Sequence, residues 1–280
     1  MIIILGSDGM LGREFLRLYG ERAKGLSRKD CDFTDFSVLN KLLDANKCSL
    51  IINCAAVIDI SYIEKFEDKS FAVNALLPFN IAKYCSRRGC SYIHISSDHF
   101  YLDEQKKHSE TFPVSLVNKY AEQKFIAEQL VLQAYPKSLV IRTSIIGCKN
   151  LDGKTFIEWI LKTIKYEKEI NGFYDAITSS IDINSFCINV EIACKKKLSG
   201  IYNIATREPY SKYNLIEAII SNLSLRDVKL NKKSVRSLTV KRANACGLDC
   251  EKFQKETGVV LPDMKETLTK INLEKIYNEI

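Results

Sequence analysis

The sequence predicts an α/β protein with a doubly wound parallel sheet and a smaller, interleaved C-terminal lobe. Three observations predict it. Apolar runs of strand length alternate with amphipathic runs of helix length from the N-terminus to residue 141. A glycine-rich turn joins the first apolar run to the first helix. The 280 residues are 46% hydrophobic, enough for one large α/β domain or two modest ones with a buried core.

The first half of the chain contains the expected strands and the helices between them. The expected strands are residues 1–5, 24–26, 49–54, 91–95 and 138–141. The expected helices cover 9–19, 36–45 and 118–134, and a further helical region ends at Arg88 with Pro78 as its expected kink. Strands that alternate with helices are joined by right-handed crossovers, which form a parallel sheet with helices on both faces.

The pattern loosens after Gly147. A helix at 155–166 carries the only tryptophan, Trp159, a strand at 200–205 returns to the sheet, and helices at about 211–222 and 262–276 are expected in the charged tail. No Gly/Ser-rich linker separates two halves, so the lobes are expected to interleave. Residues 1–148 plus about 176–205 are assigned to the dinucleotide-binding part, and about 149–175 plus 206–280 to a substrate-binding lobe.

Composition excludes several classes of protein. The longest apolar runs, such as residues 1–5, are far shorter than the roughly 18–20 residues that cross a bilayer, so no membrane partner is expected. The start of the sequence lacks the basic region of a signal peptide, which predicts a cytoplasmic protein. The formal charge is +7, but the lysine clusters at 195–197 and 232–233 are short and lack interleaved aromatics, so no nucleic acid partner is expected either.

Ten cysteines lie singly along the chain, without a Cys-x-x-Cys pair. This distribution is typical of buried, reduced thiols in a cytosolic protein rather than of a disulfide framework. Only three histidines are present, and none has metal-ligand spacing with the thiols, so the sequence predicts no metal site.

The glycine-rich turn follows the first strand directly and opens the first helix, with glycines at Gly6, Gly9 and Gly12. Glycine permits the tight turn and the close approach of backbone to a pyrophosphate, and the helix N-terminus stabilises its negative charge. The pattern alone also fits an ordinary turn between a strand and a helix. Its place at the start of the alternating series favours a Rossmann-type dinucleotide site.

The residues after the second strand bear on the choice of cofactor. Ser27 and Arg28 stand where a basic side chain would favour the 2′-phosphate of NADPH. Asp30 and Asp32 follow closely, and an acidic residue at that place would accept the ribose 2′-hydroxyl of NADH instead. NADPH is therefore expected, and NADH is the alternative. If Arg28 is only a solvent-exposed surface charge, it favours neither cofactor.

Tyr120 and Lys124 are four residues apart in the helix expected at 118–134, and so lie on the same face. A nearby cation favours the phenolate, which suits proton exchange with a carbonyl oxygen. Chance alone predicts about one such pair in a chain of this composition, so its location carries the argument. The pair follows the strand 91–95 by one crossover, and Ser97 lies just beyond that strand, at the sheet edge where ligands of such folds bind.

Further short motifs are spread along nearly the whole chain. They are Cys31-Asp32-Phe33-Thr34-Asp35, Asn53-Cys54-Ala55-Ala56, Val73-Asn74, Ile95-Ser96-Ser97-Asp98, Asn118 and Glu128 around the Tyr-Lys pair, Arg142-Thr143-Ser144, Gly200-Ile201-Tyr202-Asn203, and Arg242 with Leu248-Asp249. With them, the chain resembles the extended short-chain dehydrogenase/reductases, and within them the dTDP-4-dehydrorhamnose reductase family.

The resemblance implies a set of cofactor contacts. The turn would hold the pyrophosphate, with Asp32 and Phe33 by the adenine and the remaining contacts along the rest of the cofactor. The full set of expected cofactor residues is Gly6, Ser7, Gly9, Met10, Leu11, Gly12, Ser27, Arg28, Asp32, Phe33, Cys54, Ala55, Ala56, Asn74, Tyr120 and Lys124.

The resemblance also implies the reaction, which is transfer of hydride to C4 of a nucleotide-linked 4-keto-6-deoxy sugar for a surface polysaccharide. Tyr120 would donate the proton, Lys124 would hold the nicotinamide ribose, and Ser97 would orient the carbonyl. The substrate would further meet Asp98, His99 and Arg242, the last facing its diphosphate. The family has tyrosine where this chain has His99, so reductase chemistry follows more directly than the identity of the sugar. The oligomeric state stays open, with a homodimer as one candidate.

Two other functions compete with this reading. One is a sugar-nucleotide epimerase or dehydratase of the same superfamily, but dehydratases carry an Asp-Glu pair where this chain has Asp98 and His99. The other is a regulatory subunit that binds NADP without turnover. Such a subunit has no need of Ser97, Tyr120 and Lys124, so the reductase is favoured.

Overall fold

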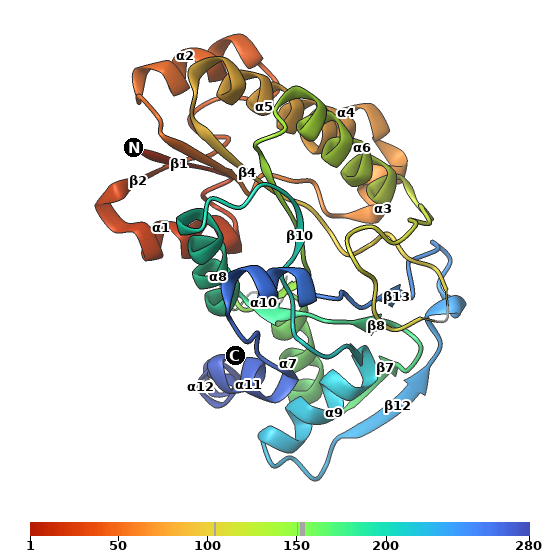
Figure 1. Ribbon diagram of the computed structural model, residues 1–280. Helices are drawn as coiled ribbons and strands as arrows, with labels where there is room; N and C mark the ends of the chain where they lie inside the picture. Colours follow the sequence, from red (N-terminus) through yellow and green to blue (C-terminus); the bar gives the residue numbers. More distant parts are fainter. Residues whose placement is uncertain (104, 150, 152–154) are drawn as a thin grey trace. The chain divides into compact units, whose positions relative to one another are not determined.

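A computed structural model describes residues 1–103, 105–149, 151 and 155–280 (Figure 1). The chain forms two compact units that alternate along the sequence. The first comprises Met1–Ser97, Leu116–Arg142 and Val190–Tyr202, and the second comprises Asp98–Ser115, Thr143–Asn189 and Asn203–Ile280.

The division differs from the expected lobes, because the second unit also takes in 98–115, 143–148, 176–189 and 203–205 and is thereby slightly larger than the first. The segments 98–115 and 143–148 follow strands of the main sheet directly in sequence, and the strand pattern alone assigned them to the lobe that holds the sheet. The expectation that one lobe binds the cofactor and the other binds the substrate stays a prediction.

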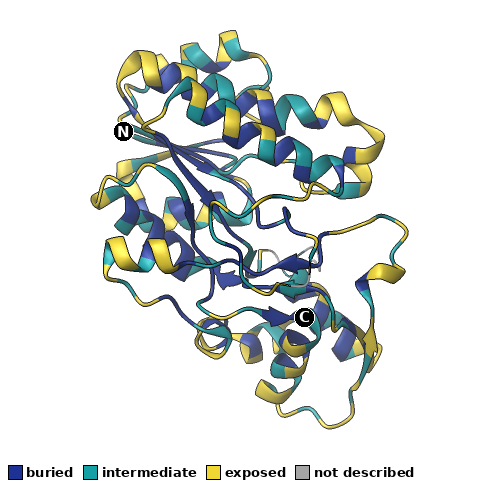
Figure 2. Ribbon diagram, turned by 45° about the vertical axis from the view of Figure 1, so that its right-hand side comes forward, coloured by how far each residue is buried: buried dark blue, intermediate teal, exposed yellow. Residues whose placement is uncertain are grey.

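The first unit is built on a six-stranded sheet in the order β10-β5-β4-β3-β1-β2. The strands are β1 (Ile2–Leu5), β2 (Ala23–Leu26), β3 (Leu50–Asn53), β4 (Ser91–Ile95), β5 (Leu139–Arg142) and β10 (Gly200–Asn203). The pairs from β2 to β5 are all parallel. Most residues of these strands are apolar, as expected where helices cover both faces, and Figure 2 shows the strands buried. The predicted fold class is confirmed.

Helices cover both faces of this sheet. On one face α5 (Leu77–Arg88) packs against α2 (Phe36–Ala45) and α6 (Lys119–Ala134) (Figure 1). On the other face lie α1 (Met10–Tyr19), the short helix η1 (Gly20–Arg22) and the end of α8 (Ile183–Lys195). An ion pair of 3.8 Å between Arg22 and Glu191 links η1 to α8.

The helical region that was expected to kink at Pro78 is interrupted before it. It consists of α3 (Ile60–Lys65), α4 (Glu67–Phe71), a π-helical turn η2 (Ala72–Leu76) and α5. Pro78 lies in the first turn of α5, where its missing N–H costs no hydrogen bond. The Leu77 N–H donates to the Ala72 carbonyl, so a π turn directly precedes Pro78, and the kink expected at this proline stays a prediction.

The second unit contains short strands that pair in three small sheets. They are β6 (Ile145–Ile146) with β9 (Ile181–Asp182), β7 (Glu169–Phe173) with β12 (Lys229–Lys233), and β8 (Ile177–Thr178) between β11 (Tyr210–Ser211) and β13 (Ala245–Cys246). Its helices are α7 (Phe156–Tyr166), α9 (Lys212–Asn222), η3 (Val235–Ser237), α10 (Glu251–Thr257), α11 (Met264–Lys270) and α12 (Leu273–Glu279). The single helix expected at about 262–276 is two helices, because Asn272 caps α12 by accepting the Lys275 N–H.

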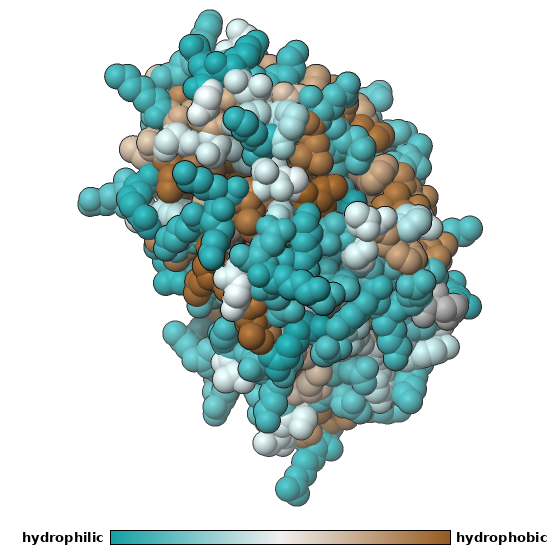
Figure 3. All heavy atoms as spheres, viewed as in Figure 1, coloured by the Kyte–Doolittle hydropathy of each residue, from teal (hydrophilic) through white to brown (hydrophobic). Residues whose placement is uncertain are grey.

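All ten cysteines are free thiols, five of them buried. Hydrophilic side chains cover most of the face seen in Figure 3. Within the described part of the chain, no helix is both long and apolar enough to cross a membrane.

Candidate functional site

The glycine turn lies at the point where the sheet reverses its strand order, between β1 and β3. Gly6 has a φ of +78°, which favours glycine. A Cβ atom on Gly6 would lie 2.8 Å from the Ala55 nitrogen, so the ends of β1 and β3 approach too closely for any side chain. The turn therefore requires glycine at this position.

The start of α1 packs directly on this turn. A side chain on Gly12 would clash with the Gly6 carbonyl, and the Gly9 N–H donates to the same carbonyl over 3.0 Å. Among the described residues, no side chain caps the first N–H groups of α1, and its first turn holds no acidic residue. These donors and the positive end of the helix dipole are suited to bind an anion such as a pyrophosphate.

The two acidic residues beyond β2 are engaged locally. Asp30 accepts the Ser27 N–H over 2.7 Å and the Ser27 hydroxyl over 3.0 Å. Asp32 accepts the Thr34 N–H over 2.9 Å, and hydrogen bonds from Thr34 lower the pKa of Asp32. Arg28 is exposed at the same loop. The loop thus offers a cation, while both carboxylates have partners. Phe33, expected beside the adenine, is only 4% exposed and packs in the core.

The segment after β3 has small side chains and an ordered backbone. The Cys54 N–H donates to the Leu5 carbonyl over 2.9 Å, and the Ala55 N–H donates to the Asn53 side chain over 3.1 Å. Ala56 is exposed. The segment expected to line the cofactor therefore lies directly beside the glycine turn.

Asn74 holds the next part of that segment in place. Its side chain accepts the Val57 N–H over 2.8 Å and donates to the Val57 carbonyl and to Gln123, each over 2.9 Å. Gln123 in turn donates to the Ser70 hydroxyl over 2.8 Å. The amide of Asn74 therefore has hydrogen-bond partners within the protein, and its predicted contact with the cofactor stays a prediction. Sequence reasoning missed Gln123 because a single glutamine in a helix has no recognisable pattern.

Lys124 reaches the carboxyl end of β4 from α6. Its side chain is 2% exposed, and its ammonium donates to the Ile95 carbonyl over 2.7 Å. Burial lowers the pKa of Lys124 to about 8. Tyr120 stands one helical turn earlier and is half-buried, and Ser97 follows β4 and is 5% exposed. The structure thus brings Lys124 to the strand end that Ser97 follows.

A buried ion pair fixes α6 to the sheet. Glu128 of α6 accepts from Arg142 of β5 over 2.7 Å, and the two side chains are 0% and 3% exposed. The Ser96 hydroxyl also donates to Glu128, over 2.5 Å. These contacts set the position of the helix that carries Tyr120 and Lys124.

The second unit contains a pocket of about 50 Å³. It is lined by Asp98, His99 and Arg242, the three residues predicted for the substrate, together with Lys212 and Cys246. Burial and the charge of Arg242 lower the pKa of Lys212. Sequence reasoning missed Lys212 and Cys246, since neither stands in a motif. Two cations and one carboxylate make the pocket suited to an anionic ligand.

Comparison with known proteins relates the chain to one family. The family model described as "RmlD substrate binding domain" matches residues 1–276. A dTDP-4-dehydrorhamnose reductase of Aggregatibacter actinomycetemcomitans is 26% identical over 96% of this chain and 97% of its own length. A dTDP-4-dehydrorhamnose reductase of Mycolicibacterium smegmatis is 32% identical, but the match covers only 64% of this chain and 55% of that protein.

Solved structures agree on the fold. A dTDP-4-dehydrorhamnose reductase of Bacillus anthracis, in complex with NADP, has a TM-score of 0.88 at 21% identity and covers 100% of this chain and 99% of its own. A reductase of the same name from Clostridium acetobutylicum also has a TM-score of 0.88, at 22% identity, over 96% of this chain and 97% of its own.

Proposed function

Because the chain belongs to the RmlD substrate binding domain family, we propose that it is an NAD(P)H-dependent reductase of a nucleotide-linked 4-keto-6-deoxy sugar. The product would serve the synthesis of a surface polysaccharide. The observation that carries the proposal is Lys124, a buried ammonium that α6 delivers to the end of β4 one helical turn after Tyr120.

The proposed reaction adds hydride and a proton across the C4 carbonyl. The bound dinucleotide supplies the hydride. Tyr120 donates its phenolic proton to the C4 oxygen, and the ammonium of Lys124 stabilises the phenolate that forms. Ser97 donates a hydrogen bond to the same oxygen and orients it. Solvent then returns a proton to Tyr120.

NADPH is the proposed cofactor. The uncapped start of α1 and the glycine turn suit the pyrophosphate. Arg28 is exposed beyond β2, whereas Asp30 and Asp32 already accept hydrogen bonds within their own loop. An exposed cation there favours a 2′-phosphate over a 2′-hydroxyl. NADH is the alternative.

The pocket of the second unit is the proposed place for part of the nucleotide sugar. Lys212 and Arg242 supply positive charge for the diphosphate, and Asp98 and His99 supply polar groups for the sugar. A homodimer and a cytoplasmic location remain predictions from the sequence.

The first test is an NADPH-oxidation assay with dTDP-, GDP-, UDP- and CDP-linked 4-keto sugars, with the product ring analysed by NMR. Turnover is expected with at least one of them, and the Tyr120→Phe variant should lose on the order of 100-fold or more in kcat, as for removal of a general acid. Tyr135→Phe, at the far end of the same helix, is the matched control and should keep the wild-type rate.

A wild-type rate in Tyr120→Phe would overturn the catalytic assignment. Absence of turnover on every sugar, with NADPH still bound, would favour the regulatory subunit instead. A product with an inverted hydroxyl and no net oxidation of NADPH would identify an epimerase.

A further inference from the structure

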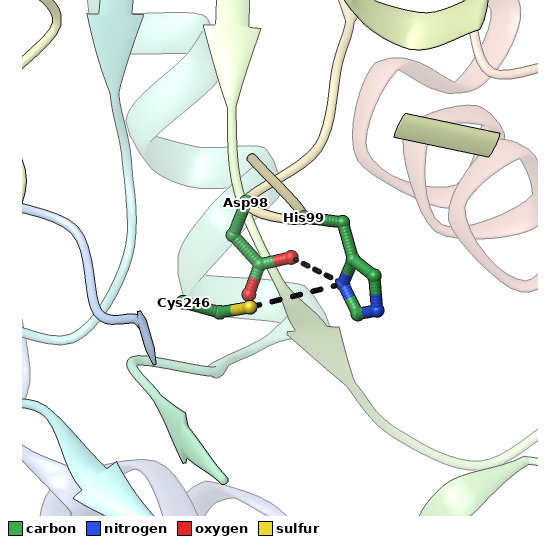
Figure 4. Close-up of side chains that lie close together, drawn as sticks. All are labelled: Asp98, His99 and Cys246. Atoms are coloured by element: carbon green, nitrogen blue, oxygen red, sulfur yellow. Dashed lines mark hydrogen bonds and ion pairs between the residues drawn. The ribbon is translucent and has the colours of Figure 1, made fainter. Parts of the chain in front are cut away.

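Three side chains with different ligand atoms converge beside the pocket of the second unit (Figure 4). The Asp98 carboxylate lies 3.5 Å and the Cys246 sulfur 3.9 Å from Nδ1 of His99. The three ligand atoms all lie within 4.8 Å of one another. Oxygen, nitrogen and sulfur donors thus face a common point.

These separations suit a tetrahedral metal ion. With bonds of about 2.3 Å from zinc to sulfur and about 2.0–2.2 Å to nitrogen and oxygen, ligand atoms of one tetrahedron lie roughly 3.3–3.7 Å apart. The observed distances require shifts of only a few tenths of an ångström for the two contacts that His99 makes. We propose that Asp98, His99 and Cys246 bind a divalent cation of the zinc class.

The three ligands are held together by the surrounding backbone. Cys246 lies in β13, in parallel register with Thr178 of β8. The Ala245 N–H donates to the Tyr101 carbonyl over 3.3 Å, and the His108 N–H donates to the Gly247 carbonyl over 3.0 Å. The segment that carries Asp98 and His99 is therefore tied to β13 on both sides of Cys246.

Gly247 shows how closely the two segments approach. A Cβ atom at this position would clash with the Lys106 carbonyl, so only glycine fits. A metal ion would meet a preorganised set of ligands here and would not have to assemble them.

The charges around the site are compatible with a divalent cation. The carboxylate and the thiolate balance a divalent cation, and the Cys246 thiol releases its proton to solvent as the metal–sulfur bond forms. Lys212 and Arg242 line the same pocket and oppose the cation, although the Lys212 ammonium lies 5.1 Å from the Phe156 ring, which attracts it.

Within the described part of the chain the cluster has three members, so a fourth position stays available to water or to an oxygen of a pocket ligand. The sequence predicted no metal because 147 residues separate His99 from Cys246. Spacing rules detect only ligands that lie close together in the chain.

The proposal is tested on the full chain, stripped with EDTA and without cofactor or sugar. Isothermal titration with Zn²⁺ should show one ion per chain, and Co²⁺ should produce visible bands of tetrahedral cobalt with a thiolate charge-transfer band. Cys246→Ser and His99→Gln should each weaken Zn²⁺ binding by at least about 10–100-fold, the cost of losing even a residue that supports a ligand. Cys246→Ser should also abolish the charge-transfer band.

Cys250→Ser is the matched control, because Cys250 is as buried as Cys246 and lies four residues along the chain. It should bind Zn²⁺ like the wild type, and circular dichroism checks that each variant is folded. If Cys246→Ser unfolds, His99→Gln still tests the proposed metal site, because it alters a partly exposed side chain. Wild-type protein that binds less than one ion, or binding that survives in folded His99→Gln, overturns the proposal. Neither result bears on the reductase assay, which is measured separately.

Discussion

Lys124 holds a positive charge inside the protein, beside the uncharged carbonyl of Ile95. Its ammonium donates to the Ile95 carbonyl, while burial lowers the pKa of Lys124 from 10.5 to about 8 against the opposing effects of Glu128 and Cys54. The ammonium therefore persists near neutral pH but at a cost in stability. A residue of this kind is common at functional sites, because the reaction needs a charge that folding disfavours.

Taken by itself, Lys124 makes the stability of the protein rise with pH. Between pH 8 and 10.5 the unfolded chain binds more protons at Lys124 than the folded chain does, so the free energy of unfolding rises through that window. The expected contribution is on the order of 3 kcal/mol. Buried cysteines such as Cys54 and Cys246, whose pKa values burial raises, act in the opposite direction in every variant, so the effect of Lys124 is read as a difference. Urea unfolding at several pH values should show that the free energy of unfolding of the wild type, and of the Lys119→Met control, rises relative to that of Lys124→Met between pH 8 and 10.5. Equal pH profiles for all three would contradict the burial of the ammonium.

Only some site residues could be found from single positions in the sequence. Tyr120, Lys124 and Ser97 could be found, because helical spacing and a strand end are local features. Lys212 and Gln123 could not, since each stands in the chain without a pattern and acquires its neighbours from distant segments.

The helix α6 depends on two anchors of different kinds. At its start Asn118 accepts the Ala121 N–H over 2.9 Å. In its middle Glu128 pairs with Arg142 and Ser96 inside the protein. A buried pair contributes little net stability compared with apolar residues, but removing one partner leaves the other charge unpaired. The pair therefore serves mainly to place α6 on the sheet.

Glu128→Gln should destabilise the protein by about 3–5 kcal/mol, because it leaves the Arg142 guanidinium buried without its counter-charge. Replacing both residues together, as Glu128→Leu with Arg142→Met, should recover much of that loss. Urea unfolding measures both effects. A loss below about 1 kcal/mol in the single variant, the range of exposed pairs, would show that the pair is not buried in solution.

At the level of elements, prediction succeeded where periodicity extends over several residues. The strands of the main sheet and the helices α1, α2 and α6 begin and end within two residues of their expected bounds. The interruption at Ala72–Leu76 and two-residue strands such as β8 and β13 were not predicted. A strand of two residues has no periodicity, and its pairing depends on partners far along the chain.

At the scale of the molecule, two units of similar size share one chain that passes between them several times. Each has its own hydrophobic core, one around the sheet and one around α7 and α9. A ligand that binds the native form of either unit raises the stability of that unit by mass action.

NADPH should therefore raise the melting temperature, by an amount equivalent to about 2.7 kcal/mol at 100 times its Kd. NADH at the same concentration should give a smaller shift, because Arg28 has no 2′-phosphate to bind. Arg28→Ala should remove the difference between the cofactors, while Lys29→Ala, the exposed neighbour, should keep it. A larger shift with NADH in the wild type would make NADH the cofactor.

The sequence by itself determined the fold class, the glycine turn and the Tyr120–Lys124 pair, since strand and helix periods and turn residues act over a few positions. Tertiary structure alone decided that Asn74 serves the backbone of Val57 and that Cys246 meets His99, 147 positions apart in the chain. Those outcomes depend on which distant segments pack together. The packing of distant segments depends on the whole core, so no single position of the sequence reveals it.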